Sequence, residues 1–235
     1  FLNTDSSGTA DSLGSARLDW LRGIRSQELS TNQFTGVTTG VFRKRTTVLG
    51  DIINSDPAFA YEEDFGYAEM GSSEASSYAT YVSNKHSRTP AVFVGGNDGM
   101  LHAFRAEAGS SGGVELFAYV PNAVYPNLSK LTDPGYTHHY YVDGSPTVGD
   151  AYLGGWTTVL VGSLGGGGKS IFALNVSDVA NPSTSMVMWE FTDADLGLTY
   201  SKPLIARLNG GQWAAIFGNG YNSASGRAYM YVVNL

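Results

Sequence analysis

The stretch PAVFVGGNDGMLHAF, residues 90–104, decides the fold class of this chain. An apolar run over residues 90–95 is followed by the turn-forming residues 96–99 and by a returning apolar run over residues 100–104. Two apolar runs joined by a glycine- and asparagine-containing turn predict a β-hairpin. We expect Asp98 and Gly99 to form the tight turn, with Gly99 at a positive φ angle.

The same pattern returns twice along the chain. The runs WTTVLVG (156–162) and SIFALNV (170–176) flank one glycine-rich turn, and WAAIFG (213–218) and AYMYVV (228–233) flank another. Pro146 and Pro203 are 57 residues apart, as are Trp156 and Trp213, so we expect the two tryptophans at equivalent places in adjacent units. Repeated four-stranded units of about 50 residues are typical of the blades of a β-propeller.

Composition agrees with an all-β fold. The chain has 235 residues, of which 30 are glycine and only 15% are charged. Low charge with abundant glycine and aromatic residues favours strands joined by tight turns. We predict a helical and irregular lead-in over residues 1–41, with one short helix within residues 10–28, and a partial β-propeller over residues 42–235 that covers three to four blades. Residues 62–87 are predicted to be a surface insertion.

Charge and cysteine content exclude several classes of function. A net charge of −7 argues against a nucleic-acid partner, because phosphate binding requires a basic surface. No apolar run is long enough to span a bilayer, so the chain is not expected to be membrane-spanning. Cysteine is absent, which excludes disulfides and thiolate metal sites. A Gly-, Tyr-, Ser- and Thr-rich, lysine-poor chain that starts at Phe1 without a signal peptide favours a processed piece of an exported protein.

Two glycine-rich motifs resemble enzyme signatures but do not meet their requirements. GSLGGGGKS (162–170) resembles a phosphate-binding loop, yet Ser163 stands where a glycine is needed and a strand follows where a helix is needed. GSSGG (109–113) matches a hydrolase nucleophile elbow, but a strand again follows in place of a helix. Both are predicted to be loops between strands, and no catalytic residues are predicted.

The candidate metal ligands are weak. Asp193 and Asp195 resemble the start of a calcium loop, but glycine comes fifth instead of sixth and no acidic residue closes the loop, so a turn is favoured. His138 and His139 are adjacent in an extended stretch and point to opposite faces, so they cannot chelate one metal together. The four histidines, at positions 86, 102, 138 and 139, are predicted to be satisfied or solvent-facing. We therefore predict no metal site in this segment.

Several longer motifs, in order along the chain, resemble one family. They are DWLRG (19–23), FRKR (42–45), LGDIINSDP (49–57), GGNDGMLHAF (95–104), YVDGSPTVGDA (141–151) and FGNGYNS (217–223). These segments resemble the first part of the C-terminal β-propeller domain of the PilY family of type IV pilus tip proteins, which includes the neisserial PilC proteins. The motif residues are predicted to be structural: Arg43, Arg45, Gly50, Asp51, Asn97, Asp98, Gly99, Asp143, Gly144, Pro146, Gly218, Asn219 and Gly220. Arg43, Lys44 and Arg45 could hold an acidic partner, although a solvated or locally paired charge run is commoner.

The resemblance implies a fold and a function. The fold is a seven-bladed propeller similar to that of quinoprotein dehydrogenases. The function is that of a non-enzymatic pilus biogenesis factor and tip-associated adhesin, which promotes pilus assembly, opposes retraction and supports surface attachment and twitching motility. The implied partners are minor pilins, the pilus tip and a host or abiotic surface. The implied location is extracellular, at the pilus tip or outer surface of a Gram-negative bacterium.

The resemblance also implies calcium in the full-length domain, but the family's Asp-rich loop has no counterpart in these residues, and no cofactor is expected in this segment. Asn175 stands where the family usually has Asp. The alternative function is a quinone-dependent dehydrogenase on a similar propeller. Three to four blades are fewer than the seven that the resemblance implies, so the segment is expected to be an incomplete propeller. We therefore expect this segment alone to bind no calcium and to aggregate, and a longer piece to be monomeric and to bind calcium.

Overall fold

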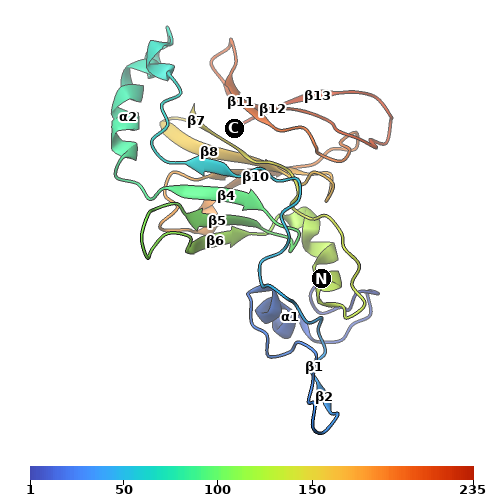
Figure 1. Cartoon of the computed structure of the whole chain (residues 1–235). Helices are drawn as coiled ribbons and strands as arrows, with labels where there is room; N and C mark the ends of the chain where they lie inside the picture. The colour runs from blue at the N-terminus through green and yellow to red at the C-terminus, as the bar shows by residue number, and fades with distance from the viewer.

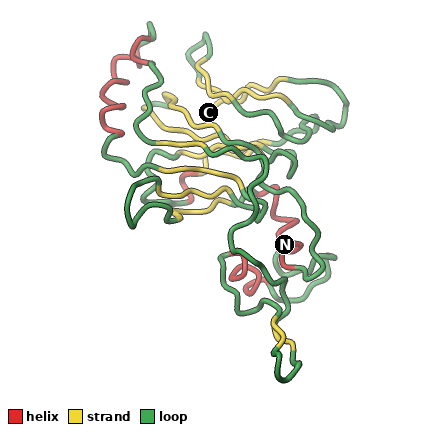
Figure 2. Tube along the Cα trace, viewed as in Figure 1, coloured by secondary structure: helices red, strands yellow, loops and turns green.

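The computed structural model describes all of residues 1–235, and most of its strands lie in three antiparallel sheets (Figures 1 and 2). The first sheet contains β3 (Ala58–Ala60), β4 (Ala91–Gly95), β5 (Leu101–Arg105) and β6 (Glu115–Tyr119). The second contains β7 (Thr147–Tyr152), β8 (Trp156–Ser163), β9 (Ile171–Asn175) and β10 (Val187–Phe191). The third contains β11 (Leu204–Arg207), β12 (Trp213–Gly218) and β13 (Met230–Asn234). Within each sheet the strands are neighbours in chain order.

The three sheets are consecutive blades of a β-propeller. The first strand of the second blade, β7, contacts the first strands of both other blades, β3 and β11. This places the three first strands side by side, as around a propeller axis, and the blades stack face to face (Figure 1). The predicted all-β class is confirmed, and the chain covers three blades, the lower end of the predicted number.

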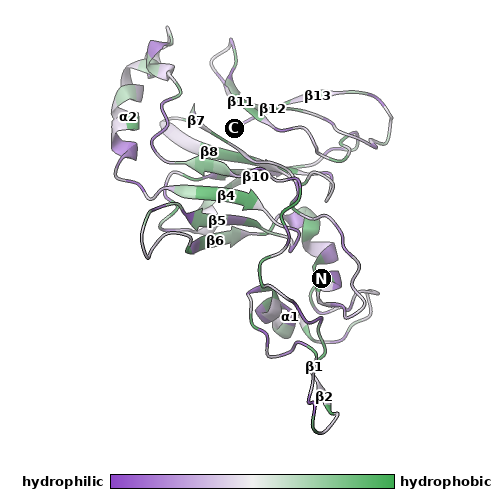
Figure 3. Ribbon diagram, viewed as in Figure 1, coloured by the Kyte–Doolittle hydropathy of each residue, from purple (hydrophilic) through white to green (hydrophobic).

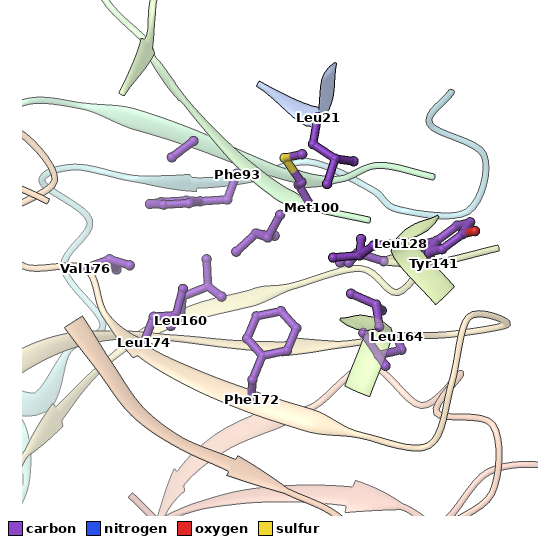
Figure 4. Close-up of a cluster of buried hydrophobic side chains, with 14 of the residues drawn as sticks. Leu21, Phe93, Met100, Leu128, Tyr141, Leu160, Leu164, Phe172, Leu174 and Val176 are labelled. Atoms are coloured by element: carbon purple, nitrogen blue, oxygen red, sulfur yellow. The ribbon is translucent and has the colours of Figure 1, made fainter. Parts of the chain in front are cut away.

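Apolar side chains fill the two spaces between the blades. Phe93 of the first blade faces Leu160, Phe172 and Leu174 of the second (Figure 4), and all four are at most 1% exposed. A second cluster, which includes Ile171, Trp213 and Phe217, lies between the second and third blades. In Figure 3 the apolar colour runs along β4, as expected of a strand that is covered on its core face. Burying each such side chain contributes about 1.5–3 kcal/mol, so each blade depends on its neighbour for stability.

The lead-in lies beside the first blade. Its only α-helix is α1 (Gly14–Leu21), where the sequence predicted a short helix, and a small hairpin of β1 (Ser30–Thr31) and β2 (Thr38–Thr39) projects away from the blades (Figure 1). α1 packs against the 3-10 helix η3 (Asn122–Thr132), which connects the first and second blades. A further 3-10 turn, η4 (Thr184–Met186), precedes β10. No helix of the structure has the length and apolar character needed to cross a membrane.

The insertion, residues 62–87, contains the 3-10 turns η1 (Tyr67–Glu69) and η2 (Ser73–Ser77) and the helix α2 (Tyr78–Lys85), which the sequence did not predict. It leaves the first blade between β3 and β4 and covers parts of the other two. The ring of Tyr67 stacks on Trp156 at 5.7 Å and meets Trp213 edge-on at 4.9 Å. Arg207 of β11 pairs with Glu74 at 2.6 Å. The insertion therefore connects all three blades, and Tyr78 within it is fully buried.

Trp156 and Trp213 occupy equivalent strands, as the 57-residue spacing predicted. Each is the first residue of the second strand of its blade, and their rings meet edge-on at 5.8 Å. Their partners on the first strands differ, because Trp156 pairs with Tyr152 and Trp213 pairs with Arg207. The turn before Trp213 is longer than the turn before Trp156, and this difference shifts the pairing.

Candidate functional site

One end of the propeller gathers most of the family-motif residues. In every blade the first strand begins, and the second strand ends, at this end, because consecutive strands are antiparallel. The segments that enter the first strands and the loops that leave the second strands therefore lie together. We call this the motif end; the turn that joins β7 to β8 and the insertion lie at the opposite end.

The tight turn between β4 and β5 has the predicted geometry. Gly99 has φ +95°, and a Cβ added there would lie 2.8 Å from Cδ2 of Leu128. The amide of Gly50 donates to Asp98 Oδ2 at 2.7 Å, which ties the segment before β3 to this turn. Gly99 therefore satisfies both a backbone and a packing requirement that other residues violate.

Asp51 and Asn97 form a second connection at the same turn. Asn97 donates from Nδ2 to Asp51 Oδ2 at 2.9 Å and accepts the amide of Tyr141 at 3.0 Å. His138 Nε2 lies 2.8 Å from the same Asp51 oxygen. Burial raises the pKa of Asp51, but the hydrogen bonds with Asn97 and His138 lower it more, and the result is a pKa below the usual value. The turn is therefore joined to the segment that enters the second blade.

His102 lies between two carboxylates. Its Nδ1 is 2.6 Å from Glu115 Oε1, its Nε2 is 3.0 Å from Asp98 Oδ1, and the residue is 5% exposed. Burial lowers the pKa of His102, but the hydrogen bonds and charges of Asp98 and Glu115 raise it more, so the pKa lies above its usual value. A neutral imidazole has one N–H, whereas both nitrogens here face carboxylate oxygens, so the geometry favours the imidazolium.

An apolar cavity of about 850 Å³ opens beside His102, between the lead-in and the outer face of the first blade. Phe1, Leu18, Met100, Phe104 and Tyr125 are among the residues that line it. Most of its polar lining belongs to the Asp98, His102 and Glu115 cluster, which satisfies itself, and Arg22 adds one cation at the wall. The cavity is therefore mainly apolar, which suits packing by an apolar segment more than catalysis.

The residues of the basic run that follows the lead-in lie in three different environments. Arg45 pairs with Glu28 at 2.7 Å, donates to the carbonyl of Trp20 and is 8% exposed. Arg43 donates from Nε to the carbonyl of Leu131 at 2.9 Å, and its guanidinium lies over the ring of Tyr136. Lys44 is exposed. Arg45 is thus locally paired with the lead-in, whereas Arg43 is held by aromatic and carbonyl groups of the segment between the first and second blades.

The Asp143–Pro146 motif joins the first and second blades. Asp143 accepts Nδ2 of Asn54 at 2.7 Å. Ser55 Oγ accepts the amide of Gly95 at 2.8 Å and donates to the carbonyl of Gly144 at 3.1 Å. A Cβ at Gly144 would lie 2.6 Å from the carbonyl oxygen of Ser163, so only glycine fits there. Pro146 is buried directly before β7.

The Gly218–Gly220 motif closes the loop between β12 and β13. Asn219 donates from Nδ2 to the carbonyls of Asp195 and Arg227, at 3.0 and 2.8 Å, and accepts the amide of Tyr229. Gly220 has φ +74°, and Gly218 donates to Ser201 Oγ at 3.1 Å. Every motif residue with a polar side chain therefore has a hydrogen-bond or ion-pair partner within the chain. That the motif residues have structural roles, and do not bind a ligand, stays a prediction.

Two serines that the sequence analysis missed repeat one hydrogen bond in different blades. Ser55 accepts the amide of Gly95 and Ser201 accepts the amide of Gly218, and in both cases the amide belongs to the last residue of a second strand. Each serine stands two residues before a proline, Pro57 or Pro203. This Ser-x-Pro spacing before the first strands of the first and third blades was the available signal.

A buried ion pair was also missed. Asp150 on β7 accepts hydrogen bonds from Lys85 and Tyr78 of the insertion and from Thr158 of β8, each at 2.8 Å. Burial is the main cause of a raised pKa for Tyr78. Neither Lys85 nor Tyr78 belongs to a recognisable motif, and 65 residues separate Lys85 from Asp150, so no local pattern could have indicated the pair.

The weak metal candidates lie in a turn. Asp193 Oδ1 accepts the hydroxyl of Tyr231 at 2.7 Å and the amide of Asp195 at 2.9 Å, and the hydrogen bond from Tyr231 lowers the pKa of Asp193. No group of three or more His, Cys, Asp or Glu side chains lies close enough to hold a metal ion. The calcium that the resemblance implies for the full domain thus has no candidate set of ligands among these residues.

The enzyme-like glycine motifs are loops. GSLGGGGKS runs from the end of β8 into β9, with Ser163 paired with Ile171 across the hairpin. GSSGG lies in the loop between β5 and β6, and no helix follows it. Both predictions from the sequence are confirmed, and neither segment has the helix that phosphate binding or a nucleophile elbow requires.

Comparisons with known proteins agree with this structure. A family model described as the PilY1 β-propeller domain matches residues 49–235. The chain is 44% identical over 243 residues to the type IV pilus biogenesis factor PilY1 homolog of Xylella fastidiosa (strain Temecula1), an alignment that covers 97% of the chain and 16% of that relative. It is 43% identical over 239 residues to the type IV pilus biogenesis factor PilY1 of Pseudomonas aeruginosa (strain PAK), covering 98% of the chain and 19% of that relative.

A solved structure is also similar. The crystal structure of the Pseudomonas aeruginosa PilY1 C-terminal domain aligns with a TM-score of 0.55 and 41% identity, over 67% of this chain and 30% of that one. The chain spans less than a fifth of the length of the two curated relatives. The resemblance that the motifs indicated is therefore confirmed, and the chain belongs to the PilY1 β-propeller domain family.

Proposed function

We propose that this chain is the propeller part of a type IV pilus biogenesis factor that promotes pilus assembly. The observation that carries the proposal is the 43–44% identity, over 97–98% of the chain, to two proteins named as such factors. We further propose that the protein opposes pilus retraction and acts as a tip-associated adhesin in surface attachment and twitching motility.

The proposed partners are minor pilins, the pilus tip and a host or abiotic surface, and the proposed location is extracellular, at the pilus tip or outer surface of a Gram-negative bacterium. The motif end supports a docking role. Its loops are joined to one another by the Asn97–Asp51, Asn54–Asp143 and Asn219–Asp195 hydrogen bonds, and loops held on a rigid scaffold are suited to recognition.

We propose that this role is not enzymatic. At the motif end, His102 is engaged with Asp98 and Glu115, and His138 is engaged with Asp51. The lysine and arginines that are buried elsewhere are paired with Asp or Glu. The alternative, a quinone-dependent dehydrogenase, predicts dye reduction with an alcohol after addition of quinone and calcium. Saturable dye reduction at the full length of the protein would overturn the non-enzymatic proposal.

The biological test removes residues 49–235 from the protein in its own bacterium. We expect loss of surface pili in the sheared fraction and loss of twitching. The same deletion in a strain without the retraction motor separates a role in assembly from a role in opposing retraction. If pili return in that strain, the protein opposes retraction; if pili remain absent, the protein is required for assembly. Normal piliation and twitching after the deletion would overturn the proposed function. An Arg105→Gln variant is the matched control, because this cation lies in a partly exposed pair with Glu107.

A further inference from the structure

A polar cleft of about 310 Å³ opens at the motif end, where the segment entering the second blade meets the glycine-rich loop between β8 and β9. Its lining consists of Asn127, Lys130, His138, His139, Tyr140, Tyr141 and the backbone of Gly166 and Gly167. No carboxylate lines this cleft, although the chain as a whole carries a net charge of −7. The lining therefore forms a local surface that attracts anions.

Three side chains with nitrogen donors in the cleft have no partner within the chain. The ammonium of Lys130, the amide of Asn127 and the imidazole of His139 make no hydrogen bond or ion pair within the chain, since Asn127 and His139 use only backbone atoms. The fourth, His138, has Nε2 on Asp51. The cleft thus presents free donors of the kind that pair with a carboxylate.

Tyrosine rings flank the glycine-rich loop. A Cβ at Gly166 would lie 2.9 Å from Cδ2 of Tyr140 and 2.7 Å from the hydroxyl of Tyr200, so the loop passes between the two rings and leaves the floor free of side chains. Tyr140 is 40% exposed, Tyr200 46% and Tyr221 68%, and the last two rings meet edge-on at 5.6 Å. The cleft therefore continues into a row of exposed aromatic rings.

These features identify a class of ligand. A sugar ring that carries a carboxylate has an apolar face and hydroxyl groups at its edge. The apolar face matches an exposed tyrosine ring, and the carboxylate matches the free amide, imidazole and ammonium donors. Only two of the eight lining residues are hydrophobic, whereas the centre of a protein–protein interface is mainly apolar. The volume lies at the small end of ligand pockets, which suits a single sugar ring.

We propose that this cleft binds an acidic sugar unit of an anionic glycan, with Lys130 and His139 facing the carboxylate and Tyr140 against the ring. The proposal names a ligand for the surface attachment proposed above and rests on that function only for its biological use. A direct binding measurement therefore distinguishes the two: the pilus phenotypes test the proposed function, and sugar binding by the purified whole protein tests this site.

The test titrates the whole protein that carries these residues with trigalacturonate and with sialyllactose, followed by calorimetry, with maltotriose as the neutral probe. We expect saturable binding of at least one acidic probe and none of maltotriose. Lys130→Gln and Tyr140→Ala are each expected to weaken binding at least about tenfold. Tyr152→Ala and His86→Ala are the matched controls, because both residues are exposed at the opposite end of the propeller, and they should leave the affinity unchanged.

Four results would overturn the proposal. The first is no saturable binding of either acidic sugar at millimolar concentration. The second is equal affinity for maltotriose, which would remove the role of the carboxylate. The third is binding of a tetraglutamate peptide but of neither sugar, which would make the cleft a site for acidic protein segments. Retained affinity in both Lys130→Gln and Tyr140→Ala would place the binding elsewhere and would equally overturn it.

Discussion

Lys85 Nζ lies 2.8 Å from Asp150 Oδ2, with side chains that are 1% and 0% exposed. Lys85 also donates to the carbonyl of Glu63 at 2.5 Å, and Asp150 accepts Tyr78 and Thr158 as well. A buried charge is tolerated when it is paired and hydrogen-bonded, and the Lys85 ammonium has two hydrogen bonds and lies 5.3 Å from the centre of the Phe65 ring. The pair joins the insertion of the first blade to the first strand of the second.

Removing one member of this pair is expected to be costly. Asp150→Asn leaves the Lys85 ammonium buried without a counter-charge, and breaking a buried pair in this way costs about 3–5 kcal/mol. Urea unfolding followed by tryptophan fluorescence measures the change. Arg105→Gln, which breaks a partly exposed pair with Glu107, should change stability by less than about 1 kcal/mol. Equal effects of the two substitutions would show that burial of the Lys85 pair has no energetic consequence.

Gly99→Val is expected to destabilise the chain by more than about 1 kcal/mol, because φ +95° is unfavourable for a β-branched residue and the added Cβ would lie 2.8 Å from Leu128. The melting temperature measures the effect. Gly71→Val is the control, since Gly71 has no positive φ and no neighbouring atom within 4 Å of an added Cβ. An unchanged melting temperature for Gly99→Val would contradict the assigned turn.

His102 is expected to make stability depend on pH. Its pKa is higher in the folded chain than in the unfolded chain, because the bonds with Asp98 and Glu115 outweigh burial. Protonation therefore favours the folded chain. The contribution is fully present below the unfolded pKa of about 6.5 and is lost as pH rises through the folded pKa.

The measurement is urea unfolding at a series of pH values from mildly acidic to mildly alkaline. His102→Gln should remove the part of the stability that falls with rising pH, whereas His86→Gln should keep it, because His86 is exposed and its side chain is 62% accessible. A His102→Gln variant with the same pH profile as the original chain would show that His102 does not titrate in this window.

The outer face of the third blade is expected to drive self-association. Leu204, Met230 and Val232 are 58%, 73% and 46% exposed on a sheet whose last strand, β13, has an unpaired edge. Exposed apolar edges of this kind associate. Light scattering should show aggregation of residues 1–235 that Met230→Lys reduces and the loop substitution Ser225→Lys does not. A monodisperse, cooperatively melting 235-residue monomer would contradict this expectation. Calcium binding is expected only of a longer piece.

The repeated elements of the fold could be predicted from the sequence, because each depends on local pattern. The hairpin at residues 90–104 and the paired positions of Trp156 and Trp213 follow from apolar runs and glycine turns. α2 could not be predicted in this way, since Tyr78 and Lys85 acquire their burial from Trp156 and Asp150, which belong to another blade.

The candidate site could likewise be predicted only where its residues follow a local pattern. The glycines of the motif end have local backbone requirements, and the sequence showed them. The partners of Asp143 and His138 are Asn54 and Asp51, which are 89 and 87 residues away, so no spacing along the chain indicates these contacts. The cleft of Lys130 and His139 is likewise assembled by the fold, and from the sequence the histidines were predicted only to be satisfied or solvent-facing.

The path of the insertion has a consequence for the time course of folding. Its rings at Tyr67 and Tyr78 are covered by Trp156 and Trp213, which a ribosome synthesises many residues later. Contacts over such sequence distances slow folding, because the intervening chain must first be closed into a loop. Residues 62–87 are therefore made early and fold late, after the second and third blades provide their surface. Until then they remain open to proteases and to the chaperones that meet the nascent chain.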